Sequence, residues 1–432
     1  MLRLHMPGHK GSSVLGPEQL DITEIEGADS LYEAEGIIRQ SEENASALFG
    51  CPTYYSTEGS SQCIRAMLYL AMLRAKENGR KPMIAAARNV HKTFLSACAL
   101  LDLDVMWLYP ENTDSYLSCA ISPAALEARL LSEQEKPTTV YLTSPDYLGN
   151  LADIAGIAKV CHRYGILLLV DNAHGAYLRF LEPSGHPIDL GADLCCDSAH
   201  KTLPVLTGGA YLHLSPARTE ISRDQVKQAL ALFGSTSPSY LILQSLDAAN
   251  TRLESYADEL QDYLPLTGEL KRNLEAGGFC LRGREPLKIT IQTADYGYTG
   301  KEIARYLLTH RMVCEFADQD HLVLMVTPET GAADLRRLRK ILQALPRKAP
   351  LRRTAPVFRP GEKVLSIRDA MLSPMEIIPV QESEGRILAA ASVGCPPAVP
   401  ILVCGERIDR YAVACFRYYG VENVAVVREP AE

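Results

Sequence analysis

The sequence lacks any long apolar segment. Its 432 residues contain no uninterrupted run of about 18 apolar residues, the length that a membrane-spanning helix needs. The opening residues, MLRLHMPGHKG, contain no apolar run of signal-peptide length. We therefore expect no membrane span and no secretory leader.

Positive charge is also scarce. The sequence has 44 Lys and Arg residues against 52 Asp and Glu residues, a formal net charge of -8. Nucleic-acid-binding proteins normally carry a basic patch, so we expect no nucleic-acid partner. The acidic balance mildly favours a small cationic ligand, although net charge is a weak guide to any one site.

The twelve cysteines are too sparse for a disulfide scaffold, and none forms a Cys-x-x-Cys pair. Several lie inside apolar runs, so we expect reduced, mostly buried thiols in a cytoplasmic protein. No spacing of His, Cys, Asp or Glu resembles a metal site. The sequence also has no nucleophile elbow, Walker loop or dinucleotide-binding glycine motif.

Short apolar segments alternate with helical periodicity through the middle of the chain. The predicted strands are residues 83–87, 105–109, 139–143, 166–171, 194–197 and 210–214. The predicted helices between them are residues 92–101, 123–131 and 153–164. This alternation is typical of an α/β fold with a mainly parallel sheet. Such sheets bind ligands at the carboxyl ends of their strands.

The rest of the chain predicts smaller parts. A helical stretch over residues 239–276 precedes strands at 287–292, 312–316 and 322–326 and helices at 301–309 and 334–345, a pattern typical of a small α+β domain. Residues 346–360, rich in Pro and Arg, predict a linker. We divide the chain into an N-terminal arm (1–50), a large domain (51–255), a small α+β domain (256–350) and a C-terminal tail domain (351–432).

Two polar side chains follow neighbouring predicted strands. Lys201 comes just after the strand 194–197, and Asp171 ends the strand 166–171. A lysine held in a pocket can form a Schiff base with an aldehyde, and a carboxylate can keep the ring nitrogen of a pyridine cofactor protonated. Taken alone, Lys201 is a solvated surface residue and Asp171 a helix cap; together they could hold opposite ends of one ring.

Two further signals point to a phosphorylated, planar ligand. The turn YYSTEGSS at residues 54–61 opens an apolar helix, 64–73. Amides at a helix N-terminus favour a phosphate, although a serine-rich cap without a ligand is more common. His91, after the strand 83–87, is either a helix-entry residue or a ring that stacks on a flat cofactor.

These motifs, in this order, resemble the Orn/Lys/Arg decarboxylases, pyridoxal-phosphate (PLP) enzymes of the aspartate-aminotransferase fold. The matching segments are HMPGHKG (5–11), DITE (21–24), GADSL (27–31), EG (35–36), LFG (48–50), RNVHKT (88–93), SPDYLG (144–149), DNAHG (171–175), SAHKTLP (198–204), STSPSY (235–240) and LD (246–247). Each motif is modest alone, but their shared order makes a chance match very unlikely. The resemblance implies an α/β PLP-binding large domain and a small α+β C-terminal part.

The resemblance implies roles at the ring of PLP. Lys201 would form the Schiff base, Asp171 would pair with the pyridine nitrogen, and His91 would stack on the ring. His174 would orient Asp171. Either Lys201 or His200 would return a proton to Cα of the substrate.

It also implies a phosphate site. Gly59, Ser60 and Ser61 would bind the phosphate in their turn, and Ser198 and His200 would approach the phosphate or the ring. In related enzymes the segment corresponding to Thr236-Ser237 reaches the cofactor of the partner subunit. We therefore expect a homodimer or a higher even-numbered oligomer.

The expected reaction is decarboxylation of a basic amino acid, with arginine favoured and lysine or ornithine next. Another PLP enzyme of this fold, such as an aminotransferase, racemase, aldolase or C–S lyase, stays open, as does a catalytically inactive relative. An aminotransferase would usually place an Arg in the segment 322–330, which has none. Glu376, Glu382, Glu384 and Glu406 could close a pocket around a cationic side chain, although surface carboxylates are the simpler interpretation.

Three positions depart from the family pattern. Asn172 stands where an acidic residue or Ser is usual, Asp146 stands where Thr is commoner, and residues 206–209 read LTGG rather than beginning LTQ. All three are expected near the substrate, so they bear on its identity rather than on the cofactor.

Overall fold

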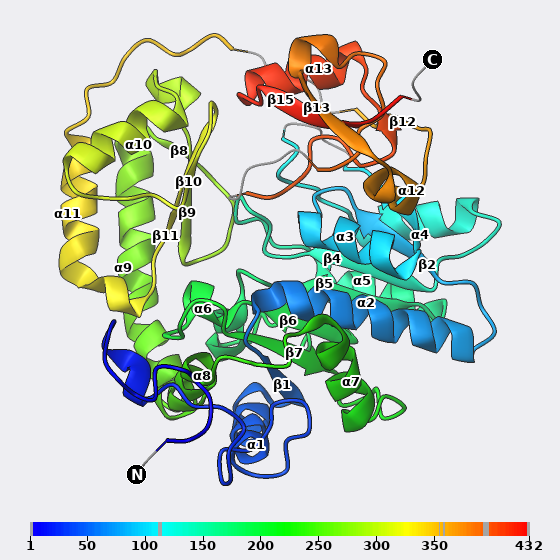
Figure 1. The fold of residues 1–432 in the computed structure, drawn as a ribbon. Helices are drawn as coiled ribbons and strands as arrows, with labels where there is room; N and C mark the ends of the chain where they lie inside the picture. Colours follow the sequence, from blue (N-terminus) through cyan, green and yellow to red (C-terminus); the bar gives the residue numbers. More distant parts are fainter. Residues whose placement is uncertain (1–2, 111–114, 354, 357–358, 392–396, 430–432) are drawn as a thin grey trace. The chain divides into compact units, whose positions relative to one another are not determined.

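The computed structural model describes residues 3–110, 115–353, 355–356, 359–391 and 397–429 (Figure 1). They belong to two compact units. The first unit comprises residues 1–82, 134–144 and 154–258, and the second comprises residues 83–133, 145–153 and 259–432. Within the described part of the chain, no helix has the length and apolar character needed to cross a membrane.

The first unit is built on strands that neighbour one another in the order β1-β7-β6-β5-β4. Their bounds are β1 Thr53–Ser56, β4 Thr139–Thr143, β5 Leu167–Asp171, β6 Leu194–Asp197 and β7 Ala210–Leu214. Strands β4, β5 and β6 are parallel, whereas β7 runs antiparallel to both β6 and β1. The carboxyl ends of the three parallel strands therefore share one edge, and Asp171 lies on it.

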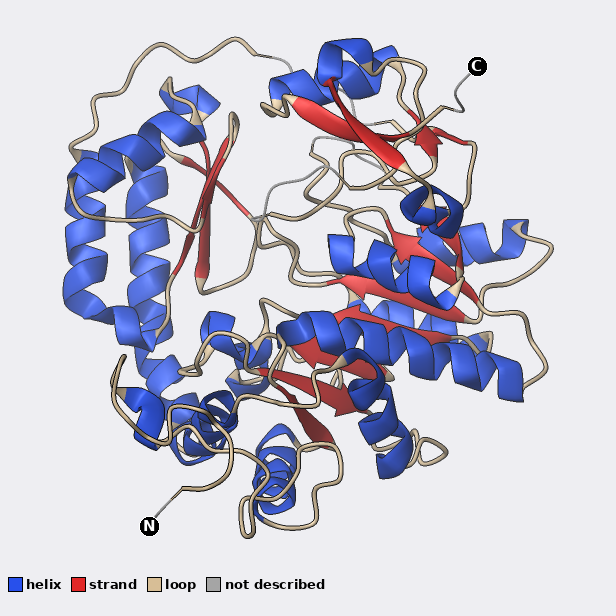
Figure 2. Cartoon of the chain, viewed as in Figure 1, coloured by secondary structure: helices blue, strands red, loops and turns tan. Residues whose placement is uncertain are grey.

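Helices bury both faces of these strands, as their continuous apolar character requires. The helices are α1 Ile37–Phe49, α2 Gly59–Glu77, α5 Ile154–Arg163, the short α6 Ala199–Thr202, α7 Arg223–Phe233 and α8 Tyr240–Leu253 (Figure 2). Helix α2 packs on β6, β7 and α7, and its side chains Cys63, Ile64 and Met67 are buried. A capping box of Ser222 and Gln225 begins α7.

The second unit contains a parallel pair and an antiparallel sheet. Strands β2 (Met83–Ala87) and β3 (Asp104–Leu108) are parallel, with α3 (Lys92–Leu101) between them in sequence and α4 (Pro123–Ser132) after them. The antiparallel sheet has the order β10-β11-β9-β8. Its strands and their helices are β8 Cys280–Arg282, β9 Lys288–Gln292, β10 Phe316–Ala317, β11 His321–Met325, α9 Tyr256–Ala276, α10 Gly300–Thr309 and α11 Gly331–Gln343.

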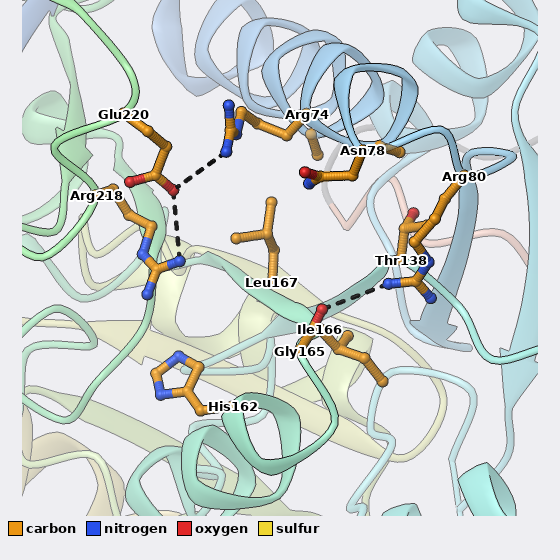
Figure 3. A pocket seen from close by; sticks show the side chains of 12 residues that line it. Arg74, Asn78, Arg80, Thr138, His162, Gly165, Ile166, Leu167, Arg218 and Glu220 are labelled. Carbon is orange, nitrogen blue, oxygen red and sulfur yellow. Dashed lines mark hydrogen bonds and ion pairs between the residues drawn. The ribbon is translucent and has the colours of Figure 1, made fainter.

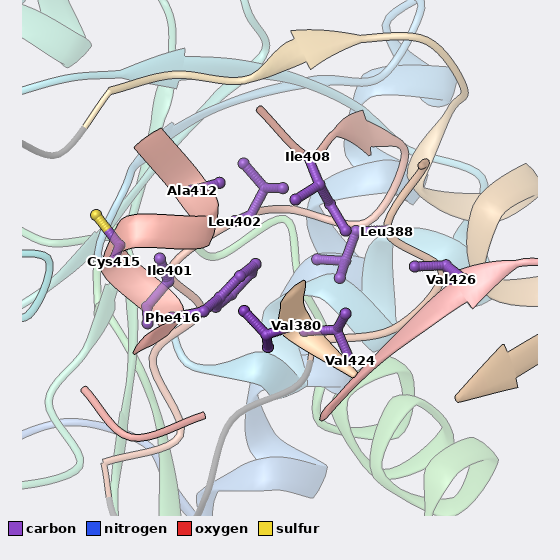
Figure 4. Close-up of a cluster of buried hydrophobic side chains, with 10 residues drawn as sticks. All are labelled: Val380, Leu388, Ile401, Leu402, Ile408, Ala412, Cys415, Phe416, Val424 and Val426. Carbon is purple, nitrogen blue, oxygen red and sulfur yellow. The ribbon is translucent and has the colours of Figure 1, made fainter. Parts of the chain in front are cut away.

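The C-terminal part of the second unit has its own small core. Strand β12 (Glu362–Lys363) pairs with β14 (Glu406–Arg407), and β13 (Met375–Pro379) pairs with β15 (Asn423–Val427). Helices α12 Ile367–Leu372 and α13 Arg410–Tyr418 also belong to this part. Phe416 of α13 packs among buried aliphatic side chains from these strands and their loops (Figure 4).

The predicted α/β architecture is confirmed, with local differences that have physical causes. The predicted strand 312–316 was wrong at its start, because Arg311 adopts φ 58° and the Met312 amide donates to the Leu307 carbonyl, which ends α10. Only the two-residue β10 follows. The predicted helical stretch 239–276 is two helices, α8 and α9. The turn at residues 54–61 is the end of β1 and the first turn of α2, so the helix begins at Gly59 rather than at residue 64.

Candidate active site

The polar side chains of the first unit gather where β5 and β6 end. Asp171 is the last residue of β5 and pairs in register with Cys196 of β6. The chain then leaves β6 and immediately forms α6, whose single turn carries His200 and Lys201. The sequence-based prediction that Asp171 and Lys201 lie at one edge of one sheet is therefore correct.

Asp171 is a buried carboxylate, 2% exposed. It accepts hydrogen bonds from the Tyr141 hydroxyl at 3.2 Å and the Ala173 amide at 3.2 Å, and the Cys196 thiol lies 3.8 Å away. Burial raises the pKa of Asp171, while nearby Lys201 and these donors lower it. Its hydrogen-bond donors among the described residues are uncharged, so a cationic N–H would be a fitting further partner.

Lys201 is held by a histidine from the turn after β5. Its Nζ lies 3.1 Å from Nε2 of His174, which is buried. The neighbouring His200 places Nδ1 2.9 Å from the Gly209 carbonyl. Burial and the charge of Lys201 lower the pKa of His200, so its ring is neutral and Nδ1 carries the proton that Gly209 accepts.

The N-terminus of α2 meets this edge through two serines. The Ser198 hydroxyl donates to the Ser60 hydroxyl at 2.9 Å, joining the start of α6 to the first turn of α2. Gly59 adopts φ 69°, and its amide donates to the Gly208 carbonyl at 2.7 Å. A Cβ on Gly59 would lie 3.9 Å from the His200 ring. The structure thus brings the predicted phosphate turn beside the predicted Schiff-base lysine.

The roles of three predicted residues, His91, Thr236 and Ser237, stay untested. His91 belongs to the second unit, where it caps α3 by accepting from the Thr93 amide; its stacking role stays a prediction. Thr236 and Ser237 are exposed in a loop that begins at Ser235, whose amide donates to Glu58 of the same chain, next to Gly59. Their contact with a phosphate also stays a prediction.

One of the acidic candidates has an internal role. Glu406 is buried, accepts from the Val403 amide at 2.9 Å and lies 3.8 Å from the Arg88 guanidinium. Arg88 in turn donates to the carbonyls of Pro400 and Ile401. Glu376 pairs with Arg386, while Glu382 and Glu384 are exposed. Asp146 accepts from the amides of Leu148 and Asn150, so it closes its own turn.

A cavity of about 180 Å³ lies at the opposite edge of the sheet (Figure 3). Its lining includes residues 165–167 and Thr138, where β5 and β4 begin, and the side chains of Arg74, Arg218 and Glu220. Glu220 lies 3.9 Å from Arg74 and 3.5 Å from Arg218. Because Asp171 ends β5, this cavity is separate from the candidate active site.

Sequence reasoning missed Tyr141. Tyr141 lies on β4 opposite Leu169, two residues before the end of β5, so its hydroxyl reaches Asp171 from the neighbouring strand. Side chains on both faces of β4 are buried, so the sequence of β4 does not show which of them point towards Asp171. Only the register of β4 against β5 identifies Tyr141.

The comparisons with known proteins agree along nearly the whole chain. Residues 5–277 match the family model "Orn/Lys/Arg decarboxylase, major domain", and residues 354–426 match "Orn/Lys/Arg decarboxylase, C-terminal domain". The chain belongs to the Orn/Lys/Arg decarboxylase family.

Two relatives from Bacillus subtilis illustrate this membership. The chain is 28% identical to an arginine decarboxylase over 440 residues, 94% of this chain and 88% of the relative. It is 31% identical to the protein YaaO over 437 residues, 95% of this chain and 89% of the relative. The Francisella novicida lysine decarboxylase LdcF shares the fold, with a TM-score of 0.79, 16% identity, and coverage of 99% of this chain and 79% of that one.

Family and fold make pyridoxal phosphate the cofactor, and the residues at the edge of the sheet fit it. The buried Asp171 has uncharged donors and suits a protonated ring nitrogen. Lys201 stands one turn after the neighbouring strand, and the N-terminus of α2, a 19-residue helix, supplies amides and hydroxyls for a phosphate.

Proposed function

We propose that this decarboxylase acts on arginine, and that the sheet edge of the first unit is its catalytic centre. The observation that carries the location is the convergence of Asp171, Lys201 and the start of α2, which are far apart in sequence. Support for arginine comes from the arginine decarboxylases of Bacillus subtilis, Halalkalibacterium halodurans and Bacillus anthracis, each 28% identical to the chain. Lysine and ornithine are the next candidates.

Asp171 and Lys201 would hold the cofactor ring between them. Bound pyridoxal phosphate supplies an electron sink for the bond that breaks at Cα. Asp171 would keep the proton on the ring nitrogen, because its buried carboxylate is stabilised by a cation at hydrogen-bonding distance. Lys201 would anchor the aldehyde carbon, with His174 at 3.1 Å fixing the direction of its amine.

The phosphate would bind at the first turn of α2. The amide of Gly59 is used by Gly208, so the amides and hydroxyls of the two following serines are the suitable donors. Ser60 also accepts from Ser198, which ties the phosphate site to the strand that carries Lys201.

Lys201 is the better candidate for returning the proton to Cα. In the neutral His200 ring, Nδ1 donates to Gly209, so Nε2 carries a lone pair and no proton. The Lys201 amine can hold a proton, and it would lie beside the ring of the bound cofactor, with His174 at 3.1 Å from its Nζ. We propose that Lys201 is the donor and that His200 supports the cofactor by packing against the Gly59 turn.

We also propose a cytoplasmic homodimer. Eleven described cysteines are free and eight of them are buried, in keeping with a reducing compartment. The exposed Thr236-Ser237 loop lies beside Glu58 and is available to a second chain.

A substrate panel tests the function. The purified protein with added pyridoxal phosphate is incubated separately with L-arginine, L-lysine and L-ornithine, and carbon dioxide and the product amine are measured together. We expect equimolar carbon dioxide and agmatine from arginine, and neither from Lys201→Ala. Amine exchange to a keto acid, loss of optical rotation without carbon dioxide, or no reaction with any of the three would refute the proposal in favour of an aminotransferase, a racemase or an inactive relative.

A further inference from the structure

A second buried carboxylate lies beside the candidate active site. Asp197 ends β6, four residues before Lys201, and is 0% exposed. Its Oδ2 lies 3.2 Å from Nε2 of His186 and 3.2 Å from Nε2 of His213, and its Oδ1 accepts from Nδ2 of Asn172 at 2.7 Å. We call these four residues the Asp197 cluster.

Both histidines place Nε2 at 3.2 Å from the carboxylate of Asp197. Burial lowers the pKa of His213, so its ring is uncharged and Nε2–H donates to the carboxylate. Nδ1 of His213 lies 3.0 Å from the Thr53 hydroxyl, and the Phe49 ring packs against both imidazoles. The nearby Cys51 and Cys195 thiols have pKa values raised by burial and carry no charge. The two histidines hold the pKa of Asp197 well below its usual range, so this buried carboxylate is ionised at neutral pH.

Asn172 links this charge to the cofactor turn. Asn172 follows Asp171 directly, and its backbone N–H donates to the Cys196 carbonyl at 3.0 Å. A Cβ on Gly175 would lie 2.1 Å from Oδ1 of Asn172, so the asparagine side chain packs tightly over the turn 171–175. That turn presents Asp171 at one end and His174, the partner of Lys201, near the other. The side chain of Asn172 is therefore held between Asp197 and the turn.

The side chains of Asn172 and Asp197 are matched as hydrogen-bond donor and acceptor. An amide at position 172 can donate to the ionised Asp197, whereas an acidic residue there would place two carboxylates in contact. Because both side chains are buried, a mismatch would leave an unpaired polar group, which is costly.

We propose that Asp197 is a positioning residue for the cofactor: through Asn172 it holds the turn that carries Asp171 and His174. The proposal rests on the roles proposed above for Asp171 and Lys201. Asp197 itself does not touch the reacting atoms. It fixes the separation between the carboxylate and the lysine that hold the cofactor ring.

The test measures cofactor binding rather than turnover. Asp197→Asn and Asn172→Ala are compared with the wild type and with Asp193→Asn, by equilibrium dialysis against pyridoxal phosphate and by pH titration of the visible absorbance of the lysine-bound cofactor. Asp193 is the matched control: it is also buried, accepts from the Leu168 amide and His162, and precedes β6 at the opposite end of that strand.

We expect Asp197→Asn and Asn172→Ala each to raise the dissociation constant about tenfold, or about 1.4 kcal/mol, and to shift the absorbance titration. The dissociation constant of the double variant should also be raised by no more than about tenfold, because both substitutions remove the same contact between Asn172 and Asp197. Asp193→Asn should lower the unfolding temperature while leaving the dissociation constant within about twofold of wild type. A roughly hundredfold loss in the double variant, or an equal loss in Asp193→Asn, would overturn the proposal.

Two other outcomes are separable. If the wild type binds no pyridoxal phosphate, the proposed active site fails; if the wild type binds it and Asp197→Asn binds it equally well, only the positioning role fails. Ligand atoms of His186, Cys195, Asp197 and His213 lie within 4.8 Å of one another, so elemental analysis accompanies the assay. About one zinc per chain, lost in Cys195→Ser but kept in the buried control Cys161→Ser, would replace the hydrogen-bond cluster by a metal site and overturn the proposal.

Discussion

Replacing Asp171 by asparagine separates the charge of this residue from its shape. The side chain is 2% exposed, so the amide occupies the same buried space but cannot balance a protonated ring nitrogen. A hydrogen bond to a charged group contributes about 1.5–3 kcal/mol. At about 1.36 kcal/mol per tenfold change in rate, losing it should lower kcat/KM by about 10- to 150-fold.

Tyr141→Phe is the matched control. It removes the hydroxyl that donates to Asp171 at 3.2 Å and keeps the carboxylate. A typical hydrogen bond contributes about 0.5–1.5 kcal/mol, so the expected loss is about 2- to 12-fold. The structure thus predicts that Asp171→Asn is the more damaging change by about tenfold.

Steady-state release of carbon dioxide from arginine measures both variants, with circular dichroism to confirm that each is folded. Asp171→Asn should keep the covalent attachment at Lys201, seen by borohydride reduction and peptide mapping, while losing activity. If Asp171→Asn stayed within twofold of the wild type, or if Tyr141→Phe were equally impaired, the carboxylate would have no special role in holding the ring proton.

Three further outcomes are expected. Ser198→Ala should raise the dissociation constant of pyridoxal phosphate about three- to tenfold with little change in kcat, because it frees the first turn of α2 from the strand that precedes Lys201; dialysis measures this. The pKa of Asp197 is lower in the folded protein than in the unfolded chain, where it is about 3.9. Its contribution to the free energy of unfolding is therefore complete above about pH 4 and is lost as pH falls through the lower folded-state pKa. In urea titrations, the difference in free energy of unfolding between wild type and Asp197→Asn should narrow from pH 5 to pH 3, each about one unit from the unfolded-state pKa, and a difference that widens would contradict this sign. If the loop contacts the active site of the partner subunit, mixing Lys201→Ala with a Thr236→Ala/Ser237→Ala variant should restore about a quarter of wild-type activity. The reason is that roughly half the dimers are mixed and each mixed dimer has one intact site. No recovery of activity would show that the loop acts in the site of its own chain.

Much of the fold follows from local patterns. Strands β2, β4, β6 and β7 have the predicted bounds, because each is a short apolar run between turn or helix signals. The antiparallel direction of β7 is not visible in its composition. It follows from the short link after β6, where the single turn α6 is too brief for the usual helical crossover to a parallel strand.

The position of the candidate cofactor residues was predictable because chemistry and topology agree at them. A lysine after one strand and an aspartate ending another must share an edge if both strands are parallel neighbours, and the structure has this arrangement. The acidic residues of the tail gave no such constraint. Glu406 is polar in the sequence yet buried against Arg88, a contact between positions more than three hundred residues apart that no local pattern marks.

The link between Asp197 and Asn172 depends on strand register. Asp171 is opposite Cys196, so the next residues along the two parallel strands, Asn172 and Asp197, are brought together. Side chains alternate between faces with a period of two, so a slip of one residue would turn Asp197 away from Asn172. The same slip would displace α6, which follows β6 directly, and would carry Lys201 away from His174. One register therefore sets both the 2.7 Å contact between Asn172 and Asp197 and the 3.1 Å contact between Lys201 and His174. For this reason, we expect a substitution at Asp197 to change the dissociation constant of the cofactor more than it changes the free energy of unfolding.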